Sequence, residues 1–305
     1  MSSELSDGVI IQELHSLEEI AEWQAVAGAV WSGDDAHRLQ ASLLLTLGRY
    51  GGLLLGARDA GGSMVGILLG FPGIKDGEAV HCSHMLGIVP EWRNRHLGYR
   101  LKCRQRELVL AQGLDRIVWT FDPLQTPNAH LNLGHLGGIS YQYHVNLYGA
   151  MNDALNCGME SDRLTLTWLI RHPLVEQRLA GQAPPPSATE LLAAGTPLLT
   201  RTSVARESDS REEYLSLVET RTGHDAAWML VEVPSNIQSI KRLNIAQAQA
   251  WRLGIREILT DLFERGYSLL DLVVEALPGQ PRRCYYLVGQ HERYVNIGAD
   301  PLDSV

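Results

Sequence analysis

The sequence predicts a mixed α/β fold, in which a mostly antiparallel central sheet is flanked by helices and followed by a second, smaller α/β unit. Two observations support this fold class: short β-rich runs alternate with amphipathic helical patterns, and a proline-rich segment divides the chain. With 305 residues, of which 45% are hydrophobic and 20% charged, the composition is that of a globular protein and excludes a disordered or fibrous chain.

The first ninety or so residues predict a strand, two helices and a three-strand meander. Ser16 and Glu19 have the spacing of a capping box, which indicates a helix start at Leu17. Gly61 and Gly62 separate two apolar runs and predict a hairpin, because glycine supplies the positive φ of tight turns. The expected elements are strands Val9–His15, Gly52–Ala57, Met64–Phe71 and Ala79–Ile88, with helices over Leu17–Trp31 and from Asp34 onwards.

The pattern becomes helical after Pro90 and ends at Gly113, a natural helix C-cap. The apolar stripe of this helix comprises Leu97, Leu101, Leu108 and Ala111, and the cations Arg100, Lys102, Arg104 and Arg106 lie mostly off it. A strand over Arg116–Phe121 follows, and two strands joined by a helix are expected to be parallel. A short helix over Asn128–Leu136 and strands Tyr141–Tyr148 and Leu164–Ile170 complete this part.

A domain boundary is expected after Pro173, because the stretch from Gly181 to Ser187 has the composition of a linker. This divides the chain into a first domain of residues 1–173, a linker of residues 174–195 and a C-terminal α/β unit of residues 196–305. The C-terminal unit is expected to contain strands Ala227–Val233, Ser268–Glu275 and Arg283–Val288 and one long helix over Ser239–Arg265. Its role stays open among a lid, a dimer interface, an added strand and a degenerate duplication of the first half.

The charge balance bears on partners and compartment. Asp plus Glu outnumber Lys plus Arg by 35 to 26, a net charge of −9, which argues against a general nucleic-acid binder. The four widely spaced cysteines suggest no disulfide framework, and the absence of a signal or apolar span favours a cytoplasmic protein without membrane contact. The histidine pairs His81/His84 and His130/His135 lack the spacing of a hydrolytic zinc site, so no metal is expected.

A local cationic segment stands out against this acidic average. From Glu91 to Arg106 the chain has six cations and one acid, at a predicted strand-to-helix turn. Unpaired N–H groups and the helix dipole favour an anion at such a turn. The alternative is a solvated helix face.

The pattern Leu86-x-Ile88-x-Pro90-x-x-Arg93-x-x-His96-x-Gly98 resembles the cofactor motif of the GCN5-related N-acetyltransferases (GNAT). The order of predicted elements matches that family over Val9 to Ile170, and the segments WTFDPL, NAxLNL and SDRL resemble a poorly characterised branch of it. The resemblance implies that acetyl-CoA, or another acyl-CoA, binds at Leu86, Ile88, Arg93, Asn94, Arg95, His96, Leu97, Gly98, Tyr99 and Asn128. His96 stands where the family usually has glycine, so its Cβ obstructs the phosphate or its ring donates to it.

Acyl transfer to an amine needs a base, and the family's usual glutamate falls on His84 of the strand Ala79–Ile88. Histidine titrates near neutral pH, which suits this role. His81 and Glu78 are weaker candidates. Regular alternation places His84, Leu86 and Ile88 on one face of the strand and His81, Ser83 and Met85 on the other.

The family's usual acid, a tyrosine, aligns with Asn132 or Leu133 and is therefore missing. Its predicted substitute is Tyr148, with Tyr141 and Tyr143 as alternatives, although the thiolate of CoA can also leave unassisted. The predicted substrate residues are Asp122, Asp162 and Arg163. The two aspartates belong to a group of acids that also includes Asp153 and Glu160, and Asn156–Arg163 is a predicted substrate loop. Ordinary loop and cap acids are the alternative.

These inferences lead to two hypotheses of different class. The first is an acyltransferase that moves an acetyl or other acyl group from CoA directly to an amine of a small molecule or a protein. The second is a catalytically silent acyl-CoA-binding or regulatory protein with the same fold, and a metal-dependent hydrolase is an outlying third. A homodimer is compatible with the first two.

Overall fold

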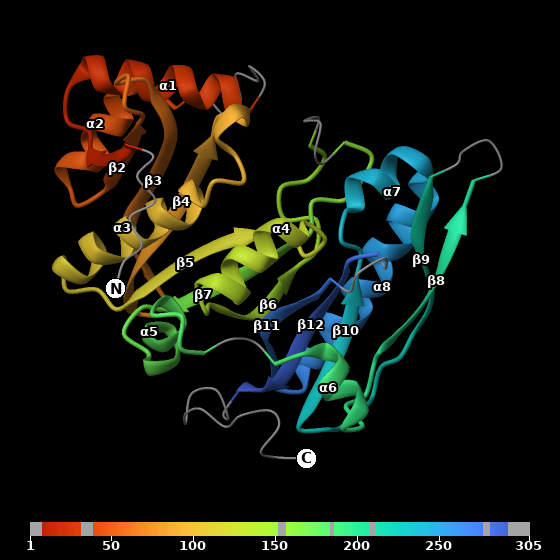
Figure 1. Ribbon diagram of the computed structural model, residues 1–305. Coiled ribbons are helices and arrows are strands. Elements are labelled where there is room, and N and C mark those ends of the chain that lie inside the picture. Colours follow the sequence, from red (N-terminus) through yellow and green to blue (C-terminus); the bar gives the residue numbers. More distant parts are fainter. Residues whose placement is uncertain are drawn as a thin grey trace. The chain divides into compact units, whose positions relative to one another are not determined.

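The computed structural model (Figure 1) describes residues 8–31, 39–151, 157–183, 186–207, 212–276 and 281–291. Contacts between Cα atoms divide the chain into two compact units, Met1–Trp119 and Thr120–Val305. Mixed helices and strands, mostly in antiparallel pairs, make up both units, which confirms the predicted α/β fold class. Within the described ranges, no helix is long and apolar enough to cross a membrane.

The first unit has the predicted order of elements. Its strands are hydrogen-bonded in the order β1-β2-β3-β4-β5, with antiparallel pairs up to β4 and a parallel β4–β5 pair, as expected for two strands joined by a helix. The elements are β1 (Ile10–Glu13), α1 (Leu17–Val30), α2 (Ala41–Arg49), β2 (Leu53–Arg58), β3 (Met64–Lys75), β4 (Glu78–Ile88), the 3-10 turn η2 (Pro90–Trp92), α3 (Leu97–Ala111) and β5 (Arg116–Phe121), which continues past the division between the units. The predicted start of the second helix, Asp34, lies outside the described residues.

Two apolar layers cover the two faces of this sheet. Trp23 of α1 and Leu44 of α2 pack with Leu69 and Met85 on one face, and Leu97 and Leu101 of α3 pack on the other with a layer that includes Leu68. The capping box of α1 is present, because Ser16 accepts from the Glu19 N–H and the Glu19 carboxylate accepts from the Ser16 N–H. Burial of one large apolar side chain such as Trp23 stabilises the fold by about 1.5–3 kcal/mol.

The second unit has five strands hydrogen-bonded in the order β7-β6-β11-β12-β10 and a separate two-stranded sheet, β8–β9. The pairs β6–β7, β6–β11, β11–β12, β10–β12 and β8–β9 are all antiparallel. The elements are α4 (Thr126–Ala129), the π-helical turn η3 (His130–His135), β6 (Ile139–His144), β7 (Arg163–Leu169), α5 (Pro173–Leu179), α6 (Ala188–Ala193), β8 (Thr200–Arg206), β9 (Glu213–Thr220), β10 (Trp228–Val233), α7 (Ile237–Leu243), α8 (Ile245–Glu264), β11 (Tyr267–Glu275) and β12 (Arg283–Gln290).

Several predicted elements of this unit are wrong in detail. The long helix is interrupted at Asn244, whose extended backbone (φ −151°) ends α7 and whose side chain caps α8 by accepting from the Gln247 N–H. The strand expected to reach Tyr148 ends at His144. The β8–β9 hairpin was not predicted.

The segment predicted as a linker, residues 174–195, contains α5 and α6 in its described part. Ser187 and Thr189 donate to the Glu275 carboxylate, and Ala188 and Leu191 are fully buried in an apolar cluster with Leu230. The division into compact units falls at Trp119/Thr120, before this segment. The assignment of residues 1–173 as the acyl-CoA-binding domain stays a prediction.

Candidate functional site

A β-bulge distorts β4 at the predicted base. In the register with β3, Leu69 is opposite Met85 and Gly70 is opposite Ser83, so His84 is the extra residue. His84 is exposed, with its ring centroid 6.0 Å from that of Phe71.

The bulge reverses the faces of the strand. Ser83 accepts a hydrogen bond from Lys102 of α3, on the side where Leu86 and Ile88 also pack, whereas Met85 packs with α1 and α2. The predicted grouping of Ser83 with Met85 is therefore wrong, because one additional residue interrupts the two-residue alternation.

The pairing between β4 and β5 is very short. Within the described ranges the register comprises two positions, His81 opposite Ile117 and Cys82 opposite Val118. The next residues along the two strands are Ser83 and Trp119. Pairing with β5 stops at Cys82, two residues before the bulge residue His84, and the part of β4 that holds Leu86 and Ile88 lies beyond this pairing and is paired with β3.

The predicted phosphate-binding residues form a turn that leads into α3. Asn94 and His96 both adopt left-handed backbone conformations, with φ values of 60° and 57°, and His96 is the N-cap residue of α3. Histidine and asparagine adopt this conformation more readily than most residues. The first N–H groups of an α-helix have no acceptor within the helix, so this turn directs N–H groups and the positive end of the α3 dipole outward.

The side chains of this turn are largely exposed. Arg93, Asn94, Arg95 and His96 are exposed, Gly98 and Tyr99 are half-buried, and Leu97 is buried in the core against β3 and β4. The Arg93 Nε donates to the Ile88 carbonyl at 3.2 Å, and the Arg95 guanidinium lies 4.8 Å from the Trp92 ring centroid. Burial raises the pKa of Tyr99 to about 12, so its phenol stays protonated at neutral pH.

The buried face of α3 differs from the predicted stripe. It comprises Leu97, Leu101, Lys102, Gln105 and Val109. Lys102, predicted off the stripe, is only 3% exposed, so it does not contribute to the cationic surface. Arg104 forms an exposed ion pair with Glu107, and Arg100 donates to the Val9 carbonyl at 2.7 Å.

A buried polar cluster lies between α3 and β4. The Lys102 Nζ donates to Ser83 Oγ at 2.7 Å and to Gln105 Oε1 at 3.3 Å, and lies 3.5 Å from the Trp119 ring centroid. His81 is fully buried, and in the described structure its two ring nitrogens and the Gln105 Nε2 have no hydrogen-bond partner. The helical and strand patterns of the sequence do not predict this cluster.

Burial determines the protonation of this cluster. Desolvation lowers the pKa of Lys102 well below its usual value, and desolvation also lowers the pKa of His81 to about 4. Burial raises the pKa of the Cys82 thiol. All three groups therefore favour their uncharged forms. His81 is fully buried, Glu78, the other weaker base candidate, is exposed and paired with Arg116, and His84 is exposed.

In the second unit, Asp122 and Asp162 are already neutralised by arginines of α8. Asp122 accepts two hydrogen bonds from Arg252, at 2.8 and 2.7 Å, and Asp162 accepts two from Arg256, both at 2.9 Å. Both carboxylates are buried. These pairs give the acids a structural role, and their predicted contact with a cationic substrate stays a prediction without support from this geometry.

Of the other predicted residues of this unit, Tyr148 and Asn128 are exposed, whereas Arg163 is buried and lies 3.9 Å from Asp122. Tyr148 is 56% exposed, its hydroxyl lies 2.9 Å from Thr120 Oγ, and the Arg163 guanidinium lies 5.3 Å from its ring centroid. Asn128 is exposed on α4. Of the alternative acids, Tyr143 donates to buried Asp162, which together with desolvation raises its pKa strongly.

Two further predictions concern segments that are only partly described. Asp153 and Asn156 lie outside the described residues. Among the residues that the structure does describe, no group of three or more His, Cys, Asp or Glu side chains could hold a metal ion.

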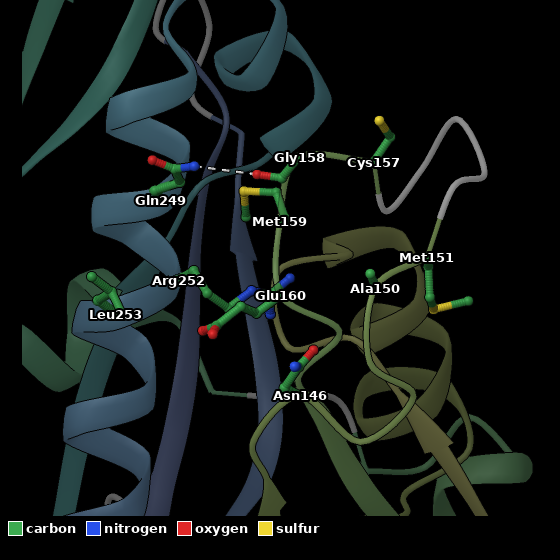
Figure 2. A pocket seen from close by; sticks show the side chains of 10 residues that line it. All are labelled: Asn146, Ala150, Met151, Cys157, Gly158, Met159, Glu160, Gln249, Arg252 and Leu253. Atoms are coloured by element: carbon green, nitrogen blue, oxygen red, sulfur yellow. Dashed lines mark hydrogen bonds between the residues drawn. The ribbon is translucent and has the colours of Figure 1, made fainter.

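A pocket of about 570 Å³ lies in the second unit between α8 and the connection from β6 to β7 (Figure 2). Gln249, Arg252 and Leu253 line it from α8, and Gln249 donates to the Gly158 carbonyl at 3.3 Å across one end. The connection contributes Asn146, Ala150, Met151, Cys157, Gly158, Met159 and Glu160. The predicted substrate loop therefore does line a pocket through its described residues.

No family model matches the sequence, and no curated protein matches it. A GNAT-family acetyltransferase from Streptococcus pneumoniae aligns with 52% of this chain and 98% of its own, at 18% identity and a TM-score of 0.44. The NatC complex bound to Gag peptide and CoA aligns with 53% of this chain and 98% of its own, at 14% identity and 0.43.

The ribosomal-protein-S18-alanine N-acetyltransferase from Escherichia coli aligns with 53% of this chain and 94% of its own, at 12% identity and a TM-score of 0.43. Each of these alignments covers about half of this chain, and the rest of the chain lies outside it.

Proposed function

We propose that this chain binds acyl-CoA through β4, the following turn and the start of α3, and transfers the acyl group to an amine. The observation that carries the proposal is the sequence of three features along one segment: the bulge at His84, the part of β4 beyond its pairing with β5, and a left-handed turn that opens α3. These features suit an extended, amide-bearing arm that ends in a diphosphate.

The residues of the segment fit such a ligand. The backbone of Leu86 and Ile88 offers hydrogen-bonding groups to the pantetheine arm, and the turn from Arg93 to Tyr99 offers N–H groups to the diphosphate. The exposed guanidinium groups of Arg93 and Arg95 add positive charge, which favours a diphosphate. Asn128 keeps its predicted role as a polar contact to the arm.

The chemistry assigned to the side chains is proton transfer. When bound, acetyl-CoA supplies an activated thioester carbonyl. His84 would take the proton from the acceptor ammonium and leave a nucleophilic amine, which its exposed position on the bulge permits. Tyr148 would supply a proton to the leaving thiolate, and its exposed phenol supports that assignment.

A second candidate function is acyl-CoA binding without catalysis. It is favoured by the side chains at the position of the family's acid, because Asn132 and Leu133 are both buried and neither is an acid of suitable pKa. The Cβ of His96, where the family usually has glycine, also favours weaker cofactor binding.

Calorimetry tests binding. We expect acetyl-CoA to bind and acetyl-pantetheine, which lacks the diphosphate, to bind more weakly. Arg93→Ala should weaken acetyl-CoA binding by about tenfold, the equivalent of 1.4 kcal/mol, because one cationic contact is lost. The matched control is Arg104→Ala on α3, the helix that follows this turn, where the guanidinium is paired with Glu107. Absence of binding at millimolar acetyl-CoA would refute both functions.

Release of free thiol from acetyl-CoA in the presence of a panel of amines then separates enzyme from binder. Turnover with any amine supports the transferase, and binding without turnover supports the silent alternative. In an active protein, His84→Ala should lower kcat by about 10²–10⁴, the usual contribution of a general base. Unchanged turnover would remove His84 as the base.

A further inference from the structure

The amine of Lys102 lies where β4 and β5 separate. The last paired residues are Cys82 and Val118, and the Lys102 Nζ contacts the next residue of each strand: it is 2.7 Å from Ser83 Oγ and 3.5 Å from the Trp119 ring centroid. The amine therefore lies at the start of the separation, one residue from the bulge at His84.

The surroundings favour an uncharged amine. Lys102 is 3% exposed, and its polar partners Ser83 and Gln105 are neutral. Among the described residues, the one titratable group that raises its pKa is the Cys82 thiol, and no carboxylate contributes. The buried His81 ring is also neutral, since burial lowers its pKa to about 4. An uncharged amine is a nucleophile, whereas an ammonium group is not.

We propose that Lys102 is a self-acylation site, at which the protein transfers an acyl group from bound acyl-CoA to its own Nζ. This rests on the proposed function, because that function places the thioester in the separation between β4 and β5. The Nζ forms a bond to the thioester carbonyl carbon, the C–S bond breaks, and one amine proton passes to the thiolate. The products are an Nε-acyl lysine and CoA with a free thiol.

Acylation of Lys102 weakens the binding of a further acyl-CoA. The amide product keeps one N–H, which is enough to donate to Ser83 Oγ, but it can no longer be protonated. The added acyl group occupies the start of the β4–β5 separation, and an interior packed as closely as this one has little room for both that group and a second acyl-CoA. The modified protein therefore binds acyl-CoA more weakly than the unmodified protein.

Mass spectrometry of the full-length protein tests the proposal, because the chain has three lysines, Lys75, Lys102 and Lys241. After incubation with acetyl-CoA, we expect the mass of one acetyl group on the Lys102 peptide before either of the others. The small reagent acetyl N-hydroxysuccinimide should give the reverse order, because Lys75 and Lys241 are more exposed. Lys102→Met should abolish the acetyl-CoA product, and the control Lys241→Met should retain it.

Calorimetry on the same samples distinguishes the two proposals. If acetyl-CoA binds and Lys102 is not acetylated ahead of Lys75 and Lys241, self-acylation is overturned and the proposed function stands. If acetyl-CoA does not bind, both are overturned. If the small reagent also modifies Lys102 first, the selectivity does not come from the cofactor site, and self-acylation is again overturned. Weaker acetyl-CoA binding by the acetylated protein completes the expected result.

Discussion

Replacement of Lys102 by methionine is expected to stabilise the first unit, in a manner that depends on pH. Methionine has a similar volume and no amine, so Lys102→Met removes the cost of burying a group with no carboxylate beside it. Ser83 keeps a partner in the variant, because its hydroxyl lies 3.1 Å from Gln105 Oε1.

The size of the effect follows from proton linkage. Burial lowers the pKa of Lys102 in the folded state, so between that pKa and the ordinary lysine value of about 10.4 the unfolded chain binds more protons than the folded chain. Stability of the natural protein therefore falls as pH falls through this window, by about 1.4 kcal/mol per pH unit. As pH falls through this window, the advantage of the methionine variant should therefore grow steadily.

Urea unfolding of both proteins at several pH values between 7 and 10 measures this difference. His81 is neutral in the folded state over this range, and the small protonation of the unfolded chain near pH 7 is common to both proteins and cancels in the comparison. The Cys82 thiol titrates in both proteins, so most of its contribution cancels in the comparison. Lys241→Met, at a less buried lysine, should show no such pH dependence. A constant difference between Lys102→Met and the natural protein from pH 7 to pH 10 would refute an uncharged amine.

Three further predictions concern other buried groups and the turn before α3. Asp122→Asn should destabilise the second unit by about 3–5 kcal/mol, because the Arg252 guanidinium stays buried, and adding Arg252→Met should recover much of that loss. Hydrogen exchange of α8 peptides measures both variants, and additive losses of stability would contradict a coupled pair. His81 has a folded-state pKa of about 4, so the free energy of unfolding should fall by about 3 kcal/mol as pH falls from 6.5 to 4. His81→Leu should suppress that fall, as measured by urea midpoints, and an equal fall in the variant would show that another group causes it. His96→Gly should change stability by less than about 1 kcal/mol, because relief of the left-handed backbone conformation offsets the added freedom of the unfolded chain. The same variant should bind acetyl-CoA more tightly in calorimetry, and weaker binding would indicate that the imidazole itself donates to the phosphate.

Much of the first unit could be predicted, because its signals are local. The capping box at Ser16, the Gly61-Gly62 turn and Gly113 after α3 each determine an element boundary from adjacent residues. The bulge at His84 could not, because it depends on which residues of β3 oppose β4, and regular alternation predicted the opposite face for Ser83.

The buried cluster gave a weaker signal. Lys102 follows Leu101 on α3 and precedes Gln105 by three residues, so helical periodicity alone is compatible with a buried position. Lysine is almost never fully buried without a partner, and that general preference placed it on the surface. Its rarity in this chain, with three lysines among 26 cations, was the one available indication.

The second unit was predicted less well, because long-range contacts determine it. Asn244 is a frequent N-cap residue, and its presence inside a long helical pattern could have indicated the break between α7 and α8. The pairing of Asp122 and Asp162 with arginines of α8 has no local signal, so both acids were predicted to face a substrate.

Those two ion pairs also determine the order in which the chain can fold. Asp122 meets Arg252 across 130 residues of sequence, and Asp162 meets Arg256 across 94 residues. During synthesis, neither carboxylate can pair with its arginine until α8 has been made. Strands β1 to β4 of the first unit, in contrast, pair with strands that are close in sequence. The stretch that includes β6 and β7 is therefore expected to mature last and together with the C-terminal strands. A chain truncated at residue 173 would lack α8 and would leave Asp122 and Asp162 without their arginine partners.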